Sequence, residues 1–195
     1  MTAPVPAKIL RHFLIGLLLA CLLPLTAAAQ EPAPDPLLRQ ALKDAFADSD
    51  SFDDRFDAEV WLTDMSGRTA RYVDDELERI EILRTLHAEA RRVELPPSLL
   101  MGLMHTESLF DRFAVSVVGA QGLMQIMPFW KKEIGREQDN LMNIQTNIRY
   151  GSTILKHYLE RSKGNLTEAL ARYNGSYGKT WYPEKVFKNQ KRYME

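Results

Sequence analysis

Apolar residues recur every three or four positions through much of the second half of the chain, the spacing of one face of an amphipathic helix. One such helix is predicted over residues 74–93, where charged side chains fill the opposite face. Its apolar stripe comprises Leu77, Ile80, Leu83 and Leu86. From Leu99 to about Phe110, apolar residues cover much of the circumference. This second pattern predicts a buried helix that Pro97 would open.

Two further helices are predicted toward the C-terminus, and one short helical segment is predicted before residue 74. Residues 147–161 carry apolar side chains on one face, and the sequence Asn165-Leu-Thr-Glu168 is typical of a capping box that opens a helix. The helix after this box would turn Leu166, Ala169, Leu170 and Tyr173 inward. A short helical piece is expected to begin at residues 57–61 and to stop at a turn at Ser66-Gly67.

Residues 111–128 lack a helical period. They contain Gly119 and Gly122, which can adopt positive φ and allow a close approach of backbone to ligand, and the segment ends at Pro128. We therefore expect a structured loop between helices. Because no region of note alternates apolar and polar residues as a strand does, the fold class is predicted to be mainly α.

The N-terminus has the pattern of an export signal. Two basic residues precede an apolar run over residues 13–23, and small residues follow it. This run is too short to span a bilayer, which takes roughly 20 apolar residues. We predict a signal peptide over residues 1–29, cleaved after Ala29, that directs the protein to the periplasm. The residues up to Cys21 also resemble a lipobox, so an outer-membrane lipoprotein attached to the membrane through acylated Cys21 is the alternative.

The rest of the chain divides into three predicted parts: a Pro-rich spacer at residues 30–36, an acidic, partly helical accessory segment at 37–89, and a main domain at 90–190. Removal of the leader leaves 23 basic and 26 acidic residues. The remaining chain is therefore slightly acidic and lacks the excess of positive charge that nucleic-acid-binding proteins carry. A single Cys allows no intrachain disulfide. The four His residues do not cluster at ligand spacing, so neither a metal site nor a cofactor is predicted.

Glu107 is the leading candidate for chemistry. It lies near the end of the predicted buried helix, one turn past Leu103 and Met104, where burial disfavours its charged form and raises its pKa. A carboxyl that stays protonated near neutral pH is what cleavage of a glycosidic bond requires, because the leaving oxygen must receive a proton. Position alone is weak support, since most glutamates at helix ends are solvated.

Three other titratable residues have competing interpretations. Asp111 lies four residues after Glu107 and would share its face on a continuing helix, so the two could act as acid and nucleophile. The alternative for Asp111 is a helix cap or a solvated position. His105 falls on a different helix face from Glu107, and we expect no general-base role for it. His87 flanks the apolar stripe of residues 74–93 and is expected at the edge of the core.

Three sequence blocks surround and follow Glu107. The first comprises Glu107-Ser108-Leu109-Phe110, Ala114, Ser116 and residues 119–128, Gly-Ala-Gln-Gly-Leu-Met-Gln-Ile-Met-Pro. The second comprises Asn140-Leu141, Asn147-Ile148 and Gly151, and the third is Ala171-Arg172-Tyr173-Asn174-Gly175. In this order the blocks resemble those of the family 1 lytic transglycosylases, the SLT-domain group, over about residues 90–190.

The resemblance implies a lysozyme-like (goose-type) helical domain with a short extended motif at the active-site cleft. It also implies that Glu107 is the only catalytic carboxyl and protonates the oxygen between N-acetylmuramic acid and N-acetylglucosamine in peptidoglycan strands. Glu107 would then accept the proton of the sugar's own C6 hydroxyl as a 1,6-anhydro ring closes. No water is consumed, so the enzyme would be a lyase that serves cell-wall remodelling.

The same resemblance implies places for six further residues. Ser116 would hydrogen-bond Glu107 or the N-acetyl group of the substrate, and the Tyr173 hydroxyl would point at one of the same two groups. Met124 and Gln125 would line the sugar subsites, with Met127 close to the apolar sugar faces. Asn174 would hold the neighbouring loop or a sugar hydroxyl. Outside this motif, Met124, Met127 and Tyr173 would be interpreted as core residues.

Two other functions stay open at this level. A goose-type-lysozyme-like muramidase would share the fold but use water, and a non-catalytic peptidoglycan-binding protein would keep the fold without cleavage. An intact set of Glu107, Ser116, Gln125 and Tyr173 argues against the second. Partners from the wall-synthesis or secretion machinery are not identified by the sequence. The basic tail from Lys185 to Arg192 would either lean toward the anionic wall polymer or form a solvated terminal helix.

Overall fold

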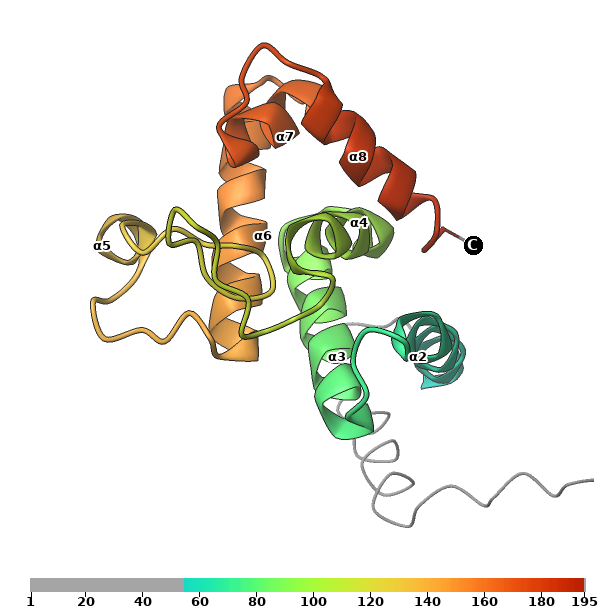
Figure 1. Ribbon diagram of the computed structural model, residues 1–195. Helices are drawn as coiled ribbons and strands as arrows, with labels where there is room; N and C mark the ends of the chain where they lie inside the picture. The colour runs from blue at the N-terminus through green and yellow to red at the C-terminus, as the bar shows by residue number, and fades with distance from the viewer. Residues whose placement is uncertain (1–54, 195) are drawn as a thin grey trace, which may run out of the picture. The chain divides into compact units, whose positions relative to one another are not determined.

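The computed structural model describes residues 55–194. These residues form α2 (Arg55–Thr69), α3 (Glu76–Arg92), α4 (Pro97–Ser108), α5 (Trp130–Ile134), α6 (Ile144–Arg161), α7 (Leu166–Asn174) and α8 (Trp181–Gln190) (Figure 1). Strand-like pairing in this part of the chain is limited to isolated antiparallel bridges, Val115 to Gln121 and Gln121 to Ile126. The mainly α class and the short extended motif are therefore confirmed, whereas the lysozyme-like arrangement stays a prediction.

Several predictions for the N-terminal part fall outside the described residues. These are the signal peptide at 1–29, the lipidation of Cys21, the spacer at 30–36 and the first part of the accessory segment. Within residues 55–194, no helix combines the length and apolar character needed to cross a membrane. The predicted domain boundary at residue 90 falls inside α3.

Capping side chains begin three of the helices. The carboxylate of Asp75 accepts from the backbone N–H of Glu78 at 2.9 Å, and Asn143 accepts from Thr146 at the same distance. Asn165 accepts from the N–H of Glu168 at 3.1 Å, which confirms the N-cap half of the predicted capping box. The other half is wrong, because the Glu168 carboxylate pairs with Arg172 at 2.7 Å instead of returning to the cap.

Two details of the predicted helices are also wrong. Leu77 is 48% exposed and does not belong to the apolar stripe of α3. The turn predicted at Ser66-Gly67 is absent, because α2 continues through both residues to Thr69. The buried side chains of Leu62 and Met65 on α2 join the same core cluster as those of α3. Because this packing stabilises α2, the helix continues through Gly67, although glycine is unfavourable inside a helix.

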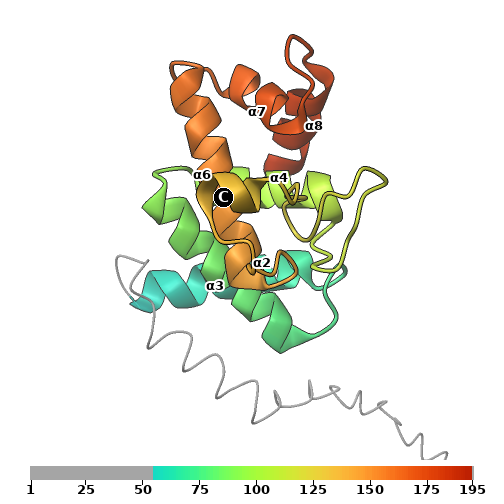
Figure 2. The ribbon, with the colours of Figure 1, turned by 90° about the vertical axis from the view of Figure 1, so that its left-hand side faces the viewer.

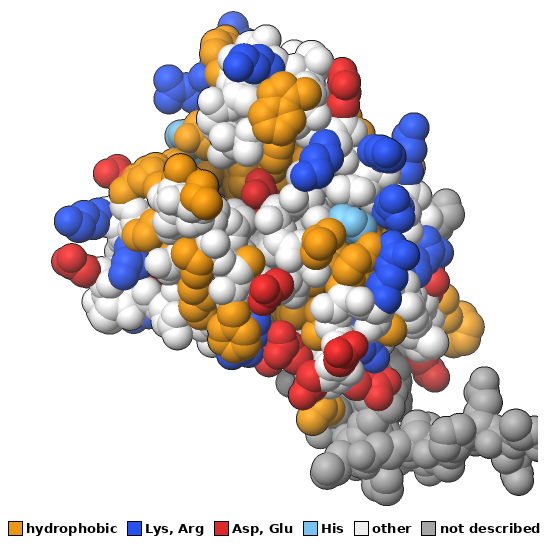
Figure 3. Space-filling model, viewed as in Figure 1, with side chains coloured by type: hydrophobic (Ala, Val, Ile, Leu, Met, Phe, Trp, Pro, Cys, Tyr) orange, Lys and Arg blue, Asp and Glu red, His pale blue; other side chains and the backbone are white. Residues whose placement is uncertain are grey.

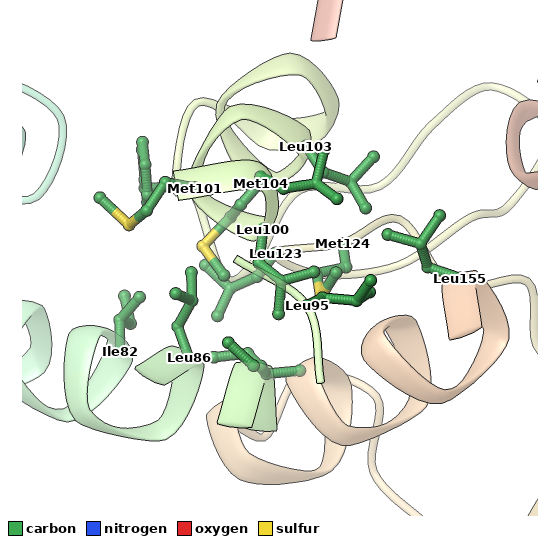
Figure 4. Packing of buried hydrophobic residues seen from close by; sticks show 14 of the residues in the cluster. Ile82, Leu86, Leu95, Leu100, Met101, Leu103, Met104, Leu123, Met124 and Leu155 are labelled. Carbon is green, nitrogen blue, oxygen red and sulfur yellow. The ribbon is translucent and has the colours of Figure 1, made fainter. Parts of the chain in front are cut away.

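The centre of the core is α4. Leu99, Leu100, Met101, Leu103 and Met104 have no exposed surface, and α3, α6 and the 123–126 segment supply the apolar side chains that surround them (Figure 4). Fully burying one such side chain stabilises the fold by about 1.5–3 kcal/mol. His87 lies at the edge of this core as predicted, 7% exposed, with its ring 4.9 Å from that of Trp61.

The C-terminal helix α8 packs directly on α4 (Figures 1 and 2). This close approach requires a glycine at position 102 of α4, because a Cβ on Gly102 would lie 2.6 Å from the backbone nitrogen of Gln190. Tyr182 and Val186 of α8 are buried at 3% and 0% exposure, while the lysines face outward. One face of α8 therefore belongs to the core, while its basic residues lie on the solvated face, and both interpretations of the basic tail stay open.

The 111–128 loop is held by Asn147 from α6. Its side-chain nitrogen donates to the carbonyl oxygens of Gln121 (2.8 Å) and Leu141 (2.7 Å), and its oxygen accepts from the N–H of Met124 at 2.8 Å. Gly122 has φ +76°, and a Cβ there would come within 2.4 Å of the Asn147 side chain. The predicted need for glycine at this position is confirmed. A buried amide with three bonds fixes the loop against the helical core.

Candidate active site

The end of α4 is set by an abrupt change in backbone conformation. Leu109 and Phe110 have φ values of 54° and 66°, a left-handed region that residues with a Cβ seldom occupy. Burial of the Phe110 ring offsets this strain, since it is 1% exposed and lies 5.8 Å from the ring of Tyr72 and 5.9 Å from that of Tyr193. The helix therefore stops at Ser108, and Glu107 projects from its last turn.

Glu107 opens onto a cleft of about 570 Å³. The cleft lies between the end of α4, the 114–125 loop and α8, and its lining comprises His105, Thr106, Glu107, Ser108, Leu109, Ala114, Val115, Ser116, Gln125, Lys185 and Asn189. Glu107 is the one acidic side chain among these lining residues. Ser108, its neighbour in the motif, ties the helix end to the loop by donating to the carbonyl oxygen of Leu123 at 2.7 Å.

The protonated form of Glu107 is favoured by its surroundings. Burial raises the pKa of this carboxyl to about 7, although the hydroxyl of Tyr182 and the charge of Lys185 both act to lower it. The increase predicted from an apolar helix is therefore confirmed in direction. At neutral pH the group is poised between acid and base, the condition under which a carboxyl can donate and later accept a proton efficiently.

Tyr182 contacts this carboxyl directly and was not predicted. Its hydroxyl donates to Oε1 of Glu107, 75 residues earlier in the chain. The pKa of Tyr182 is raised by burial and by the carboxyl, so the phenol keeps its proton. The four-residue spacing of Tyr182 and Val186 indicates a buried face on the terminal helix, but no spacing rule connects that face to Glu107.

Tyr173 lies close to the same carboxyl but bonds elsewhere. Its hydroxyl donates to the carbonyl oxygen of Met124 at 2.8 Å. Of its two predicted targets, Glu107 is therefore not bonded, and the acetamido group of the substrate stays a prediction. Burial and the proximity of Glu107 raise the pKa of this tyrosine well above its ordinary value. Tyr173 therefore positions the loop that faces the carboxyl, and it does so as a neutral phenol.

Ser116 and Gln125 both line the cleft with Glu107. Ser116 Oγ accepts from the N–H of Ala120 at 3.0 Å and so closes the tip of the loop. The side-chain nitrogen of Gln125, whose backbone has φ 50°, donates to the carbonyl oxygens of Ala114 (3.1 Å) and Gly122 (3.0 Å). Both residues hold the loop wall in place, and their contacts with substrate stay predictions.

Like Tyr173, three further predicted site residues lie outside this lining. Met124 has no exposed surface. It packs so closely against Gly151 of α6 that a Cβ on Gly151 would lie 2.4 Å from the Met124 sulfur. Its side chain belongs to the core, which corrects its predicted place in the sugar subsites. Met127 is half-buried before Pro128, and Asn174 is exposed at the end of α7. Their predicted sugar contacts stay predictions.

Asp111 and His105 are both engaged in contacts away from the Glu107 carboxyl. Because α4 ends at Ser108, Asp111 does not share a helical face with Glu107; it is exposed, and its carboxylate accepts from the N–H of Phe113 at 2.8 Å in a local turn. His105 Nδ1 lies 2.6 Å from the hydroxyl of Tyr193 in a buried aromatic cluster. Burial, followed by the nearby arginine and lysine charges, lowers the pKa of His105.

The arrangement supports proton transfer by one carboxyl. It contains an acid with a pKa near 7, a phenol that orients it, and an open cleft into which a ligand can enter. Among residues 55–194, His, Cys, Asp and Glu nowhere gather in a group of three or more that could hold a metal ion.

Comparison with known proteins agrees with this geometry. Residues 84–194 match the family described as the Transglycosylase SLT domain. A protein named Transglycosylase from Enterobacteria phage PRD1 is 35% identical over 111 residues, covering 54% of this chain and 41% of that protein. Membrane-bound lytic murein transglycosylase C of Actinobacillus pleuropneumoniae serotype 5b (strain L20) is 30% identical over 115 residues, covering 49% of this chain and 32% of that protein.

Other relatives are similar over comparable lengths. Soluble lytic murein transglycosylase of Escherichia coli (strain K12) is 31% identical over 98 residues, covering 45% of this chain and 15% of that protein. Among solved structures, an inactive mutant of lytic transglycosylase Slt from Pseudomonas aeruginosa has a TM-score of 0.45 at 24% identity, covering 80% of this chain and 28% of that one. The chain thus spans less than half the length of the curated relatives it matches.

Proposed function

Since the chain belongs to the transglycosylase SLT domain family, we propose that it is a lytic transglycosylase that cleaves the glycan strands of peptidoglycan. The reaction breaks the bond between N-acetylmuramic acid and N-acetylglucosamine and leaves a 1,6-anhydro ring on the muramic acid. Glu107 is the catalytic residue, and no cofactor takes part. The enzyme is a lyase, because the atoms of water do not enter the products.

One observation supports this reaction above all: the described lining of the cleft contains a single carboxyl, held near pKa 7. Ordinary glycosidases need two, about 5–5.5 Å apart in retaining enzymes and about 6.5–9.5 Å apart in inverting ones. The next acid in the chain, Asp111, is exposed and bonded within its own turn. A single carboxyl must therefore serve as acid and then as base.

The chemistry balances with this one group. Protonated Glu107 gives its proton to the glycosidic oxygen, the bond from that oxygen to C1 of muramic acid breaks, and positive charge develops at C1. The resulting carboxylate then removes the proton of the C6 hydroxyl, whose oxygen bonds to C1. Glu107 ends the cycle protonated, as it began, which suits a group whose pKa is close to the working pH.

The surrounding residues orient these steps. The hydrogen bond from Tyr182 holds one carboxylate oxygen and stabilises the ionised form that follows proton donation. The loop held by Ser116 and Gln125 forms the wall of the cleft opposite α8 and is the proposed surface for the N-acetyl groups of the sugars. This wall positions the glycosidic oxygen against the acid, as effective catalysis requires.

We place the activity outside the cytoplasm, in remodelling of the cell wall. The substrate is found there, and the leader predicted for residues 1–29 would export the chain to it, either as a periplasmic protein or anchored through Cys21.

Mass spectrometry of digested peptidoglycan tests the proposal. The expected products end in 1,6-anhydromuramic acid, and in water enriched in the heavy oxygen isotope they carry no label. A muramidase, the rival reaction, would give reducing ends labelled at the new hydroxyl. Glu107→Gln, which keeps the shape and the acceptor for Tyr182, should abolish cleavage. Cleavage by this variant would refute the role of Glu107, and binding without cleavage by the wild-type protein would favour the non-catalytic alternative.

A further inference from the structure

A positively charged edge borders the cleft on the side of α8. Lys185 lines the cleft together with Glu107, and it lies one helical turn past Tyr182, which bonds that carboxyl. From residue 179 to residue 192 the chain has five lysines and arginines and one acid, Glu184. Figure 3 shows the blue side chains gathered over α8. The excess positive charge therefore reaches the cleft itself.

Two of these cations, Lys185 and Arg192, and a third from elsewhere in the chain, Arg71, act electrostatically on residues that line the cleft. The charge of Lys185 acts on both Glu107 and His105, and those of Arg71 and Arg192 also act on His105. Arg71 comes from the turn before α3, and Arg192 follows α8. We call Arg71, Lys185 and Arg192 the cationic rim. Lys185 and Arg192 belong to one segment and Arg71 to a distant one, so the approach of Arg71 to the other two is a property of the fold.

No acidic side chain in residues 55–194 forms an ion pair with the cationic rim. Arg71 instead lies over the ring of Tyr72, 4.6 Å from its centroid, and donates to the Tyr72 hydroxyl. Other cations of the domain do have acidic partners at 2.6–3.9 Å: Arg68, Arg79, Arg92, Arg136, Arg149, Lys156 and Arg172. The charge of the rim is left for an anion from outside the domain.

The loop edge of the cleft carries no charged side chain among its lining residues. Leu109 and Val115 line it and are 54% and 61% exposed, and its polar side chains, Ser116 and Gln125, are neutral. An anionic substituent of a bound glycan would be desolvated without a charged partner on this edge. It would be attracted to the α8 edge, where Lys185 lines the cleft together with Glu107.

Muramic acid differs from glucosamine in such a substituent, because its lactyl ether carries a short peptide with free carboxylates. We propose that the cationic rim, with Lys185 at its centre, binds carboxylates of the stem peptide on the muramic acid next to the cleaved bond. The enzyme then prefers strands whose stem peptides carry free carboxylates over strands in which these are carboxamides. This inference rests on the proposed function and deepens it by specifying the substrate.

The test compares two substrates that differ only in charge. Short glycan oligomers of one length are prepared with stem peptides bearing either free carboxylates or carboxamides, and kcat/KM is measured for each. Lys185 also influences Glu107, but both substrates meet the same acid, so the ratio of the two kcat/KM values removes that effect. The wild-type ratio should exceed one and should fall as salt screens the rim.

The variant Lys185→Gln should lower this ratio about two- to fivefold, the effect of one partly exposed charge pair, whereas Lys185→Arg should retain it. Lys132→Gln is the matched control, since Lys132 is exposed on α5 and does not line the cleft; it should leave the ratio unchanged. A wild-type ratio of one, or an equal ratio in Lys185→Gln, would overturn the inference while leaving the proposed function intact. Failure to cleave either oligomer would instead count against the proposed function.

Discussion

Replacing Glu107 with glutamine should make the protein more stable, and by an amount that depends on pH. The carboxyl has a pKa of about 7 in the folded protein against an ordinary value of 4.5. A pKa difference of one unit corresponds to about 1.4 kcal/mol. Ionising Glu107 in the folded protein therefore lowers the free energy of unfolding by about 3 kcal/mol. Glutamine has the same shape, still accepts from Tyr182 and carries no charge, so it avoids this cost.

The sign follows from proton binding. Below pH 4.5 the carboxyl is protonated in both states, and the wild-type protein has no penalty. Between pH 4.5 and 7 the unfolded chain releases the proton while the folded protein retains it, so the stability of the wild type falls as pH rises. Above pH 7 both states are ionised and the full cost is present. The free-energy difference between Glu107→Gln and wild type should therefore rise by about 3 kcal/mol across this window.

Urea unfolding of both proteins at a series of pH values from 4 to 9 measures this difference, and every other titrating group cancels between them. Glu137→Gln, at an exposed position, is the matched control, and its difference from wild type should stay flat. A flat profile for Glu107→Gln as well would show that the carboxyl is solvated, and it would remove the physical basis for its use as an acid at neutral pH.

Three further outcomes are expected. Tyr182→Phe removes the donor that favours the ionised carboxyl, so the pKa of Glu107 should rise and the alkaline limb of the kcat/KM profile should move to higher pH. Gly102→Ala forces a methyl group against the α8 backbone and should lower the free energy of unfolding in urea by about 1–3 kcal/mol; Gly67→Ala, with open space around it, should not. Asn147→Ala leaves the N–H of Met124 and the carbonyl oxygen of Leu141 without their partner, while the Gln121 carbonyl keeps its bond from Ile126, and thermal unfolding should report a loss of about 2–4 kcal/mol.

What the sequence predicts well in this domain depends on how far apart the interacting residues are. Asn165 begins α7 as predicted because the N–H that it caps is three residues away. The direction of the pKa shift of Glu107 could be predicted because the apolar helix that carries it indicates burial. In both cases the sequence signal lies within one or two helical turns, where helical periodicity specifies the neighbours.

The errors at the site involve contacts between distant segments. The bond between Tyr182 and Glu107 depends on the docking of α8 against α4, for which the local pattern holds no information. Met124 sits in a motif whose neighbours line the cleft, yet its side chain turns toward Gly151 of α6 and is buried. A motif identifies the residues of a site without specifying which of them form its surface and which support it from behind.

The docking of α8 has a consequence for molecules that are only partly folded. Release of this helix would admit water to Glu107 and remove Tyr182 and Lys185 from its surroundings. The pKa would return toward 4.5, and at neutral pH the carboxyl would have lost the proton it must donate. Under the proposed mechanism the acid can donate its proton only after α8 has docked, so the correctness of the fold is itself a condition for the proposed activity.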